Sequence, residues 1–388
     1  MKVTILDKLG EDKEEVVDLL CKAFENSTLK NHFIDFINNV PYMKFILVRD
    51  EHRCVGVLCL LDRDIYIKYI PVKVTWMSYM AVDPNYKSFK ITNLLKEALF
   101  QYSRKSSVLT VGIARKALDG YWYPYGFLGS TNFSEIYIDT SITPKIEADF
   151  IVRDFDRSDK VSLRLIELYN YTYTKVSGGV VRDKNIWKYH LQKIIKEGIE
   201  LKYVIKDSII IGYFLFKENK VLEVSGVDIF IKKSHQIINS YITCQNGDVN
   251  ELIYEVGLSH PVFVYLTKYN HSVSQRFVWN GGHIVRIESV QSLLRLLLPT
   301  IEEKLIKIGV RDFEIFINNI KFSYKNKTLV LSKVDNINVE GINKQDWMKI
   351  ILGIYDYKIL NFINPNNEEL IRLMFNDLNF QIPFLDHM

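Results

Sequence analysis

The chain has 388 residues, of which 48% are hydrophobic and 25% are charged. These proportions are typical of a globular protein with a sizeable core, and the length corresponds to about two to three domains. The net charge of +4 is spread over the chain without a long basic run, which argues against nucleic acid as a partner.

Cysteine spacing and apolar segments narrow the class further. The chain has four cysteines, Cys21, Cys54, Cys59 and Cys244. Their spacing fits no metal site, so we expect reduced thiols and no metal. The first residues lead into a strand rather than a signal peptide, and Arg295 interrupts the leucine-rich run 293–298. We therefore expect a cytoplasmic protein without membrane contact.

The first part of the chain predicts a single mixed-sheet α/β domain. Helices with apolar residues at helical spacing are expected over 11–26, over 31–38 and after Pro84. Predicted strands, rich in β-branched and aromatic residues, occupy 2–7, 43–49, 54–61, 72–82, 108–113 and 133–138.

The stretch 79–95 joins the last long strand to the helix that follows it. Pro84 cannot donate a ladder hydrogen bond and biases Asp83 away from helix, so the strand ends there. A short basic loop precedes the helix, whose start presents free backbone N–H groups and a positive dipole end. This arrangement can seat a phosphate, although an ordinary βα unit has the same pattern.

The same stretch resembles motif A of the GNAT-superfamily acetyltransferases, V-x-P-x-x-[QR]-x-x-G-x-[GA]. Val82 and Pro84 match, whereas Lys87 stands at the Gln/Arg position, Lys90 at the first Gly and Thr92 at the second small residue. A side chain at position 90 can hinder close approach to a pyrophosphate. The resemblance implies that coenzyme A is held by two sets of residues. These are the strand end Met80, Ala81 and Val82, and the loop and helix start Lys87, Ser88, Phe89, Lys90, Ile91 and Thr92.

An aromatic run follows the predicted strand 108–113. Its end, Tyr125-Gly126-Phe127, resembles the family's motif B, F-Y-x-x-x-G-[FY], in which a Tyr four residues before the Gly protonates the leaving thiolate. Trp122 holds that position here, and an indole cannot act as an acid at neutral pH. We predict that the neighbouring Tyr123 is the acid, since a phenol suits a thiolate of similar basicity. Packing of a turn by the whole cluster is the alternative.

The pattern breaks near 141–147, and a second block begins. Predicted strands there are 150–153, 201–205, 209–216 and 221–230, with a helix whose apolar face contains Val161, Leu165, Ile166 and Tyr169. This order weakly repeats the first block without the Val-x-Pro loop. A third, α+β block has helices 290–298, 344–355 and 367–375 and strands 313–317 and 328–331. Its last ten residues are unusually apolar for a terminus and are expected to dock.

Taken together, the chain resembles the enhanced-intracellular-survival (Eis) type acetyltransferases. The resemblance rests on the two motifs above, on Arg182 with Trp187, on 283–286 entering the Leu293-Leu294 helix, and on Pro383-Phe384-x-Asp386. It implies an α/β (α+β) fold with two tandem GNAT-like mixed-sheet domains and a small sterol-carrier-protein-like α+β domain. The expected boundaries are 1–146 for the GNAT acetyltransferase domain, 147–287 for the second GNAT-like domain without catalytic motif, and 288–388 for the third.

The resemblance also implies the chemistry. An acetyl group would pass from acetyl-CoA to a primary amine of a small cationic molecule or a lysine, and the C-terminal carboxylate, here that of Met388, would be the base. Glu25 and Asp386 are candidate contacts for a cationic substrate, with Asp386 at the rim of the cleft; solvated surface acids are the alternative. A homo-oligomer, trimer or hexamer, is expected from the family.

Two other functions fit the same sequence. Lys90 in place of Gly and Trp122 in place of Tyr would also suit a catalytically degenerate protein that binds an acyl-CoA or another small ligand. A lipid carrier acting through the third domain is the remaining alternative.

Overall fold

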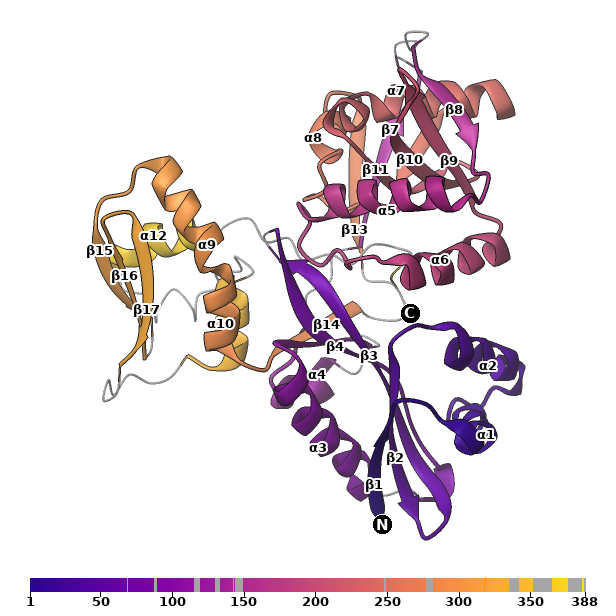
Figure 1. Ribbon diagram of the computed structural model, residues 1–388, viewed down its shortest axis with the longest axis vertical. Helices are drawn as coiled ribbons and strands as arrows, with labels where there is room; N and C mark the ends of the chain where they lie inside the picture. Colours follow the sequence, from indigo (N-terminus) through magenta and orange to yellow (C-terminus); the bar gives the residue numbers. More distant parts are fainter. Residues whose placement is uncertain are drawn as a thin grey trace.

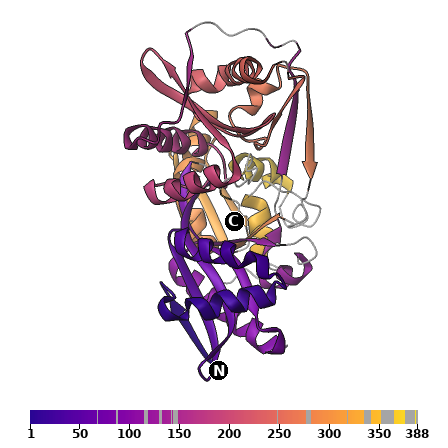
Figure 2. The ribbon, with the colours of Figure 1, turned by 90° about the vertical axis from the view of Figure 1, so that its right-hand side faces the viewer.

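The computed structural model describes residues 1–67, 69–86, 89–114, 119–129, 133–141, 143, 149–247, 249–276, 282–317, 319–334, 342–351, 365–375 and 386. Over these ranges it contains two seven-stranded mixed sheets and one three-stranded antiparallel sheet, each with its own helices (Figures 1 and 2). The expected fold class is confirmed. Within the same ranges, no helix combines the length and the apolar character needed to cross a membrane.

The first sheet has the strand order β1-β2-β3-β4-β5-β14-β6. Its strands are β1 (Lys2–Leu6), β2 (Met43–Asp50), β3 (Arg53–Ile67), β4 (Ile70–Val82), β5 (Leu109–Ala114), β14 (Gly282–Ile287) and β6 (Leu128–Gly129). Helices α1 (Lys13–Ala23) and α2 (Lys30–Asn39) bury their apolar faces on one side of the sheet. Helix α3 (Phe89–Ser106) packs on the other side through Ile91, Leu95 and Leu99, as its apolar stripe predicts.

The second sheet has the order β13-β7-β12-β11-β10-β9-β8. Its strands are β13 (His271–Arg276), β7 (Phe133–Asp139), β12 (Glu251–Tyr254), β11 (Lys220–Gly226), β10 (Ile209–Lys217), β9 (Glu200–Lys206) and β8 (Ile151–Asp154). Its helices are α5 (Asp159–Tyr173), α6 (Lys184–Glu197), α7 (Asp228–Asn246) and the short α8 (Phe263–Leu266). The predicted strand 221–230 was too long, because the chain turns into α7 at Asp228 directly after β11.

The two sheets exchange strands, which the expected boundaries 1–146 and 147–287 do not anticipate. Strand β7, predicted to belong to the first domain, pairs with β12 and β13 of the second sheet. Strand β14, predicted to belong to the second domain, pairs with β5 and β6 of the first sheet. Local alternation shows that a segment is a strand but not which sheet it joins, and this difference only appears in the structure. Each sheet therefore depends on the other block of sequence.

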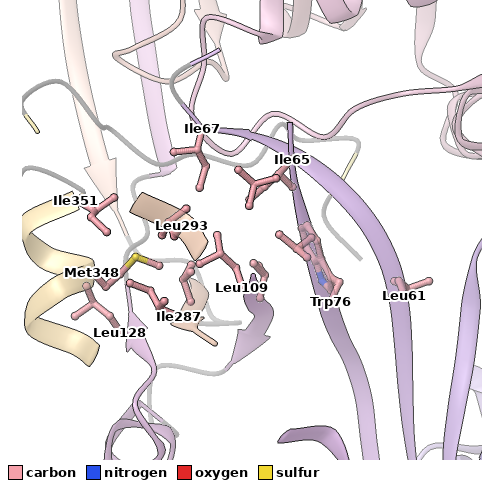
Figure 3. Packing of buried hydrophobic residues seen from close by; sticks show 14 of the residues in the cluster. Leu61, Ile65, Ile67, Trp76, Leu109, Leu128, Ile287, Leu293, Met348 and Ile351 are labelled. Atoms are coloured by element: carbon pink, nitrogen blue, oxygen red, sulfur yellow. The ribbon is translucent and has the colours of Figure 1, made fainter. Parts of the chain in front are cut away.

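The third unit packs its core onto the first sheet. Helix α9 (Val290–Ile308) leads to β15 (Phe313–Ile317), β16 (Ile320–Lys325), β17 (Thr328–Lys333), α10 (Lys344–Ile351) and α12 (Pro365–Phe375). The predicted helix 290–298 continues through Pro299 because Ile301 and Leu305 extend its buried face. Figure 3 shows Leu293, Met348 and Ile351 beside Leu109 and Ile287 of the first sheet. The expected helix end 352–355 lies outside the described residues.

Candidate active site

The first sheet opens where β4 leaves its parallel neighbour β5. The β4–β5 ladder ends at the pair Met77–Gly112, whereas β4 continues to Val82. The β3–β4 register shifts between Leu58 and Leu60, so β4 carries a bulge just beyond the point of separation. Ser78, Tyr79 and Met80 are half-buried there, although the four preceding residues, 74–77, are buried. An opening in the sheet therefore lies beside the end of β4, and the binding role of Met80–Val82 stays a prediction.

Asp83 fixes the turn that leaves β4. One carboxylate oxygen accepts a hydrogen bond from the Asn85 backbone N–H at 2.9 Å, and the other accepts from Arg53 Nη2 at 2.6 Å. The Asp83 carbonyl also accepts from the Tyr86 N–H at 2.8 Å. Because Asp83 is buried, this turn has a defined conformation before α3 begins. Sequence reasoning identified Pro84 as the strand terminator but missed Asp83 and Arg53 as the residues that shape the turn.

Helix α3 begins close to this turn. Lys90 is exposed and Thr92 is half-buried, whereas the Ile91 side chain is buried against the sheet. A Cβ at Gly56 of β3 would lie only 2.6 Å from Ile91 Cγ2, so this glycine allows α3 to approach the sheet. Phe89 is the first helical residue, and Lys87 and Ser88 lie outside the described residues. The helix start therefore follows the end of β4 closely along the chain, and its role as a phosphate seat stays a prediction.

The motif-B turn is held by both β14 and the third unit. Gly126 has a φ of +87° and its N–H donates to the Tyr123 carbonyl at 3.0 Å, so a left-handed residue ends this turn. Gln345 of α10 donates to the carbonyls of Tyr123 at 2.5 Å and Phe127 at 3.1 Å. Trp122 is buried, whereas the Tyr123 side chain is 47% exposed. The packing alternative therefore describes Trp122 better than Tyr123.

Lys96 of α3 lies among the motif-B tyrosines. Its Nζ is 2.5 Å from the Tyr125 hydroxyl and 4.9 Å from the centre of the Tyr121 ring. Burial lowers the pKa of Lys96, but its hydrogen bonds to Tyr125 and Tyr121 outweigh that effect and raise the pKa. A fixed cation therefore lies beside Tyr121 and Tyr125, the two other phenols of this turn.

An aromatic cluster covers the other face of the opening. Tyr79 makes edge contacts with Phe24, Phe33 and Phe36, with ring centres 5.7, 5.1 and 4.9 Å away. His32 of α2 lies with its Nε2 2.7 Å from the Tyr79 hydroxyl. Glu25 is exposed and directly follows Phe24, so it lies at the edge of this cluster. The periodicity of α1 and α2 predicted a core face here but not that Tyr79 and His32 meet.

Asp386 does not lie at a solvent-exposed rim. It is fully buried, with Oδ2 3.0 Å from Arg182 Nη2 and Oδ1 3.2 Å from His190 Nε2. The Tyr169 hydroxyl donates to Oδ2 at 3.1 Å, and Arg63 of β3 lies 4.0 Å from Oδ1. Burial would raise the pKa of Asp386, but these cations hold it well below the usual range. The sequence does not show which cations surround an acidic residue. The expected position of Asp386 at the rim of the cleft is therefore corrected only by the structure.

The structure describes the residues predicted to act as the acid and to bind the cofactor, but not the predicted base. Met388, the predicted base, lies outside the described residues, so its role stays a prediction. Met80 and Val82 pack in the same apolar cluster as Trp122 and helix α3, whereas Ala81 packs in the cluster on the α1 side and Tyr123 is exposed. No group of three or more His, Cys, Asp or Glu side chains suited to a metal occurs within the described ranges.

In the first unit, β4 thus leaves its parallel neighbour, carries a bulge just beyond that point, and continues through a turn into a helix. Residues 9–127 match the family model described as an acetyltransferase (GNAT) domain. Over this range the first unit is similar to the GNAT acetyltransferases. No curated protein sequence matches the chain.

Solved structures share the whole architecture. A GCN5-related N-acetyltransferase from Anabaena variabilis is 11% identical, with a TM-score of 0.70 and full coverage of both chains. One from Kribbella flavida is 11% identical with a TM-score of 0.71, covering 100% of this chain and 98% of its own. Eis1 from Mycobacterium abscessus is 10% identical with a TM-score of 0.68 and full coverage of both chains. At these identities the similarity establishes the fold.

Proposed function

We propose that the protein is an acetyl-CoA-dependent N-acetyltransferase that acts on a primary amine of a small cationic molecule or a lysine. The observation that carries the proposal is the opening between β4 and β5 beside the bulge at Ser78–Met80. The match of residues 9–127 to an acetyltransferase domain supports the same chemistry. The pantetheine of coenzyme A would lie along Met80–Val82, and its pyrophosphate at the start of α3.

The opening provides the groups that acyl transfer requires. Backbone N–H groups of β4 beyond Met77 have no ladder partner on β5, so they can polarise the thioester carbonyl. The deprotonated amine nitrogen attacks that carbon, and the carbon–sulfur bond then breaks to release the coenzyme A thiolate. A phenol of the motif-B turn gives this thiolate its proton, and we assign that role to Tyr123.

The degenerate binding protein is the second candidate, because Trp122 occupies the usual acid position and is buried. Two measurements separate the candidates: acetyl-CoA binding by calorimetry, and release of free thiol with aminoglycosides, polyamines, sugar amines and lysine peptides. Binding followed by thiol release supports the transferase. Acetyl-CoA binding without thiol release across the panel supports the degenerate protein. If Lys90→Gly binds acetyl-CoA and wild type does not, the support for the degenerate protein is stronger.

The acid assignment has its own test. Tyr123→Phe should lower kcat by about 100-fold while leaving acetyl-CoA affinity nearly intact, because only the transition state uses the proton. The matched control is Tyr69→Phe, since Tyr69 is 61% exposed at the turn between β3 and β4. If Tyr123→Phe behaves like this control, the acid is another group, and Tyr121→Phe and Tyr125→Phe become the next variants.

A further inference from the structure

The bulge in β4 places a phenol and an imidazole in contact beside the opening. Tyr79 belongs to the half-buried segment where β4 has left β5, and its hydroxyl is 2.7 Å from His32 Nε2. His32 itself is exposed on α2, so its ring reaches solvent on one side and Tyr79 on the other. No other part of the site described above combines a half-buried hydroxyl with a solvent-connected base.

We propose that Tyr79 and His32 form the proton relay that deprotonates the substrate amine. This inference rests on the proposed function and names a proton acceptor other than the carboxylate of Met388. As the amine nitrogen bonds to the acetyl carbon, its proton passes to the Tyr79 oxygen while the Tyr79 proton passes to His32 Nε2. The imidazolium then loses its proton to solvent, which restores both groups.

The surroundings suit each partner to this role. Burial raises the pKa of Tyr79 to about 12, so the phenol stays protonated and needs a base behind it. Burial lowers the pKa of His32, and Lys196 and Lys193 of α6 lower it further against the opposing effect of Asp35 on α2. The imidazole is therefore neutral near pH 7 and free to accept a proton.

The aromatic cluster fixes the geometry of the relay. The rings of Phe33 and Phe36 meet the face or edge of Tyr79 at nearly right angles, 85° and 83°, and restrict its rotation. Lys196 is held 2.9 Å from Asp35, so the strongest cation near His32 is itself paired. Proton transfer to an acceptor that is held in a fixed position is more efficient than transfer to a mobile acceptor.

The experiment compares three variants across pH with the amine that gives turnover in the panel. In wild type, kcat at saturating amine should decrease at pH values below the pKa of His32, because the imidazole is then protonated and cannot accept a proton. His32→Gln and Tyr79→Phe should each lower kcat at pH 7 by about 10- to 100-fold and abolish this acidic limb, with acetyl-CoA affinity unchanged. The control is His271→Gln, an exposed histidine on the edge strand β13, which should keep both the rate and the limb.

The outcomes are distinct. An acidic limb that persists in both His32→Gln and Tyr79→Phe overturns the relay and leaves the tail carboxylate or water as the acceptor. A wild type that binds acetyl-CoA but releases no thiol with any amine overturns the proposed function and the relay together. Both variants keep the ring or the polarity at their sites, and thermal unfolding checks that each retains the fold.

Discussion

The two sheets share the same backbone device but use it differently. In the first sheet, Gly56 pairs with Val82, a register shift follows, and the parallel ladder ends at Met77. In the second, Gly212 pairs with Gly226, the register also shifts, and the parallel ladder ends at Val221. In β4 the parallel ladder ends at Met77, five residues before Val82. In β11 it ends at Val221, likewise five residues before Gly226. The second unit therefore keeps the bulge and the separation of strands but not the site.

The connection to the following helix differs. Residues 83–88 separate β4 from α3, whereas Val227 alone separates β11 from α7. A Cβ at Gly212 would lie 2.1 Å from the Phe230 ring, so that ring of α7 lies directly over the glycine pair. The β11–α7 connection is therefore too short to form a turn like that of residues 83–86, where backbone N–H groups could surround a phosphate.

The side chain next to the register shift differs as well. Counted back from Val82 and Gly226, Glu223 corresponds to Tyr79, and both of its oxygens accept from Arg182, at 2.8 and 2.6 Å. Glu223 and Arg182 are buried, and Arg182 also binds Asp386. The first opening thus keeps a half-buried phenol beside solvent, while the second is closed by a buried ion cluster. The comparison teaches that the two units differ in the connection after the strand and in the residue next to the register shift, rather than in the sheet.

The largest expected effect is a loss of stability at acidic pH that begins in the second unit. Burial lowers the pKa of His190 and His235 to about 4 and that of His260 to about 3, and all three belong to the second unit. In the unfolded chain these histidines bind protons near pH 6.5. The folding stability that they contribute is therefore fully present above pH 6.5 and is lost as the pH falls toward 4. At about 1.4 kcal/mol per pKa unit, these shifts correspond to roughly 3–5 kcal/mol for each histidine.

Urea unfolding between pH 7 and pH 4.5 measures this loss. His260→Gln should reduce the pH-dependent part of the free energy of unfolding, and His271→Gln, at an exposed position, should not. Hydrogen exchange at pH 5 should rise first in α5–α7. Equal early loss of protection in α1–α3 would contradict the assignment of acid sensitivity to the second unit.

The next largest effect concerns the ion cluster that closes the second opening. Arg182→Met would leave Glu223 and Asp386 buried without their shared cation, and we expect a loss of about 3–5 kcal/mol in the free energy of unfolding. The control is Arg164→Met, which breaks the exposed Arg164–Glu167 pair on α5 and should cost about 1 kcal/mol or less. Similar losses in the two variants would show that the buried cluster is not structurally important.

The sequence predicts much of this comparison and misses a specific part. Alternation and Pro84 predict β4, its end and the helix after it, and the absence of a Val-x-Pro loop correctly marks the second block as different. The strand exchange and the pairing of Arg182 with Asp386 depend on contacts between residues far apart in the chain. Periodicity reports only local geometry, so it cannot identify such partners.

The same limit applies to the candidate site. Motif spacing predicted the end of β4 and the start of α3, because those positions follow one another along the chain, and their role in binding coenzyme A stays a prediction. It could not predict that Gln345 binds the motif-B turn or that His32 meets Tyr79. A lone histidine on an amphipathic helix has no local signal that distinguishes it from a surface residue.

A third prediction tests the loop that only the first unit has. Lys87→Glu would place a negative charge beside the proposed pyrophosphate seat and should weaken acetyl-CoA binding by about tenfold, which corresponds to about 1.4 kcal/mol. Calorimetry at low and high salt measures the change, and the difference should shrink at high salt. Lys232→Glu on α7 of the second unit is the matched control and should leave affinity unchanged. Equal affinity of Lys87→Glu and wild type would remove this loop from the coenzyme A site.

The smallest expected effect is at Lys90, where the family pattern has glycine. Lys90 is exposed while the next residue, Ile91, is buried against the sheet, so the Lys90 side chain points away from the sheet. Lys90→Gly should therefore leave acetyl-CoA affinity unchanged or improve it by less than about threefold, while lowering helix stability by about 1 kcal/mol. Lys90→Ala separates the two effects, since it removes the long side chain without the glycine penalty. A rise in affinity of about 100-fold in both variants would mean that Lys90 blocks the seat, and the first opening would then be as closed to coenzyme A as the second.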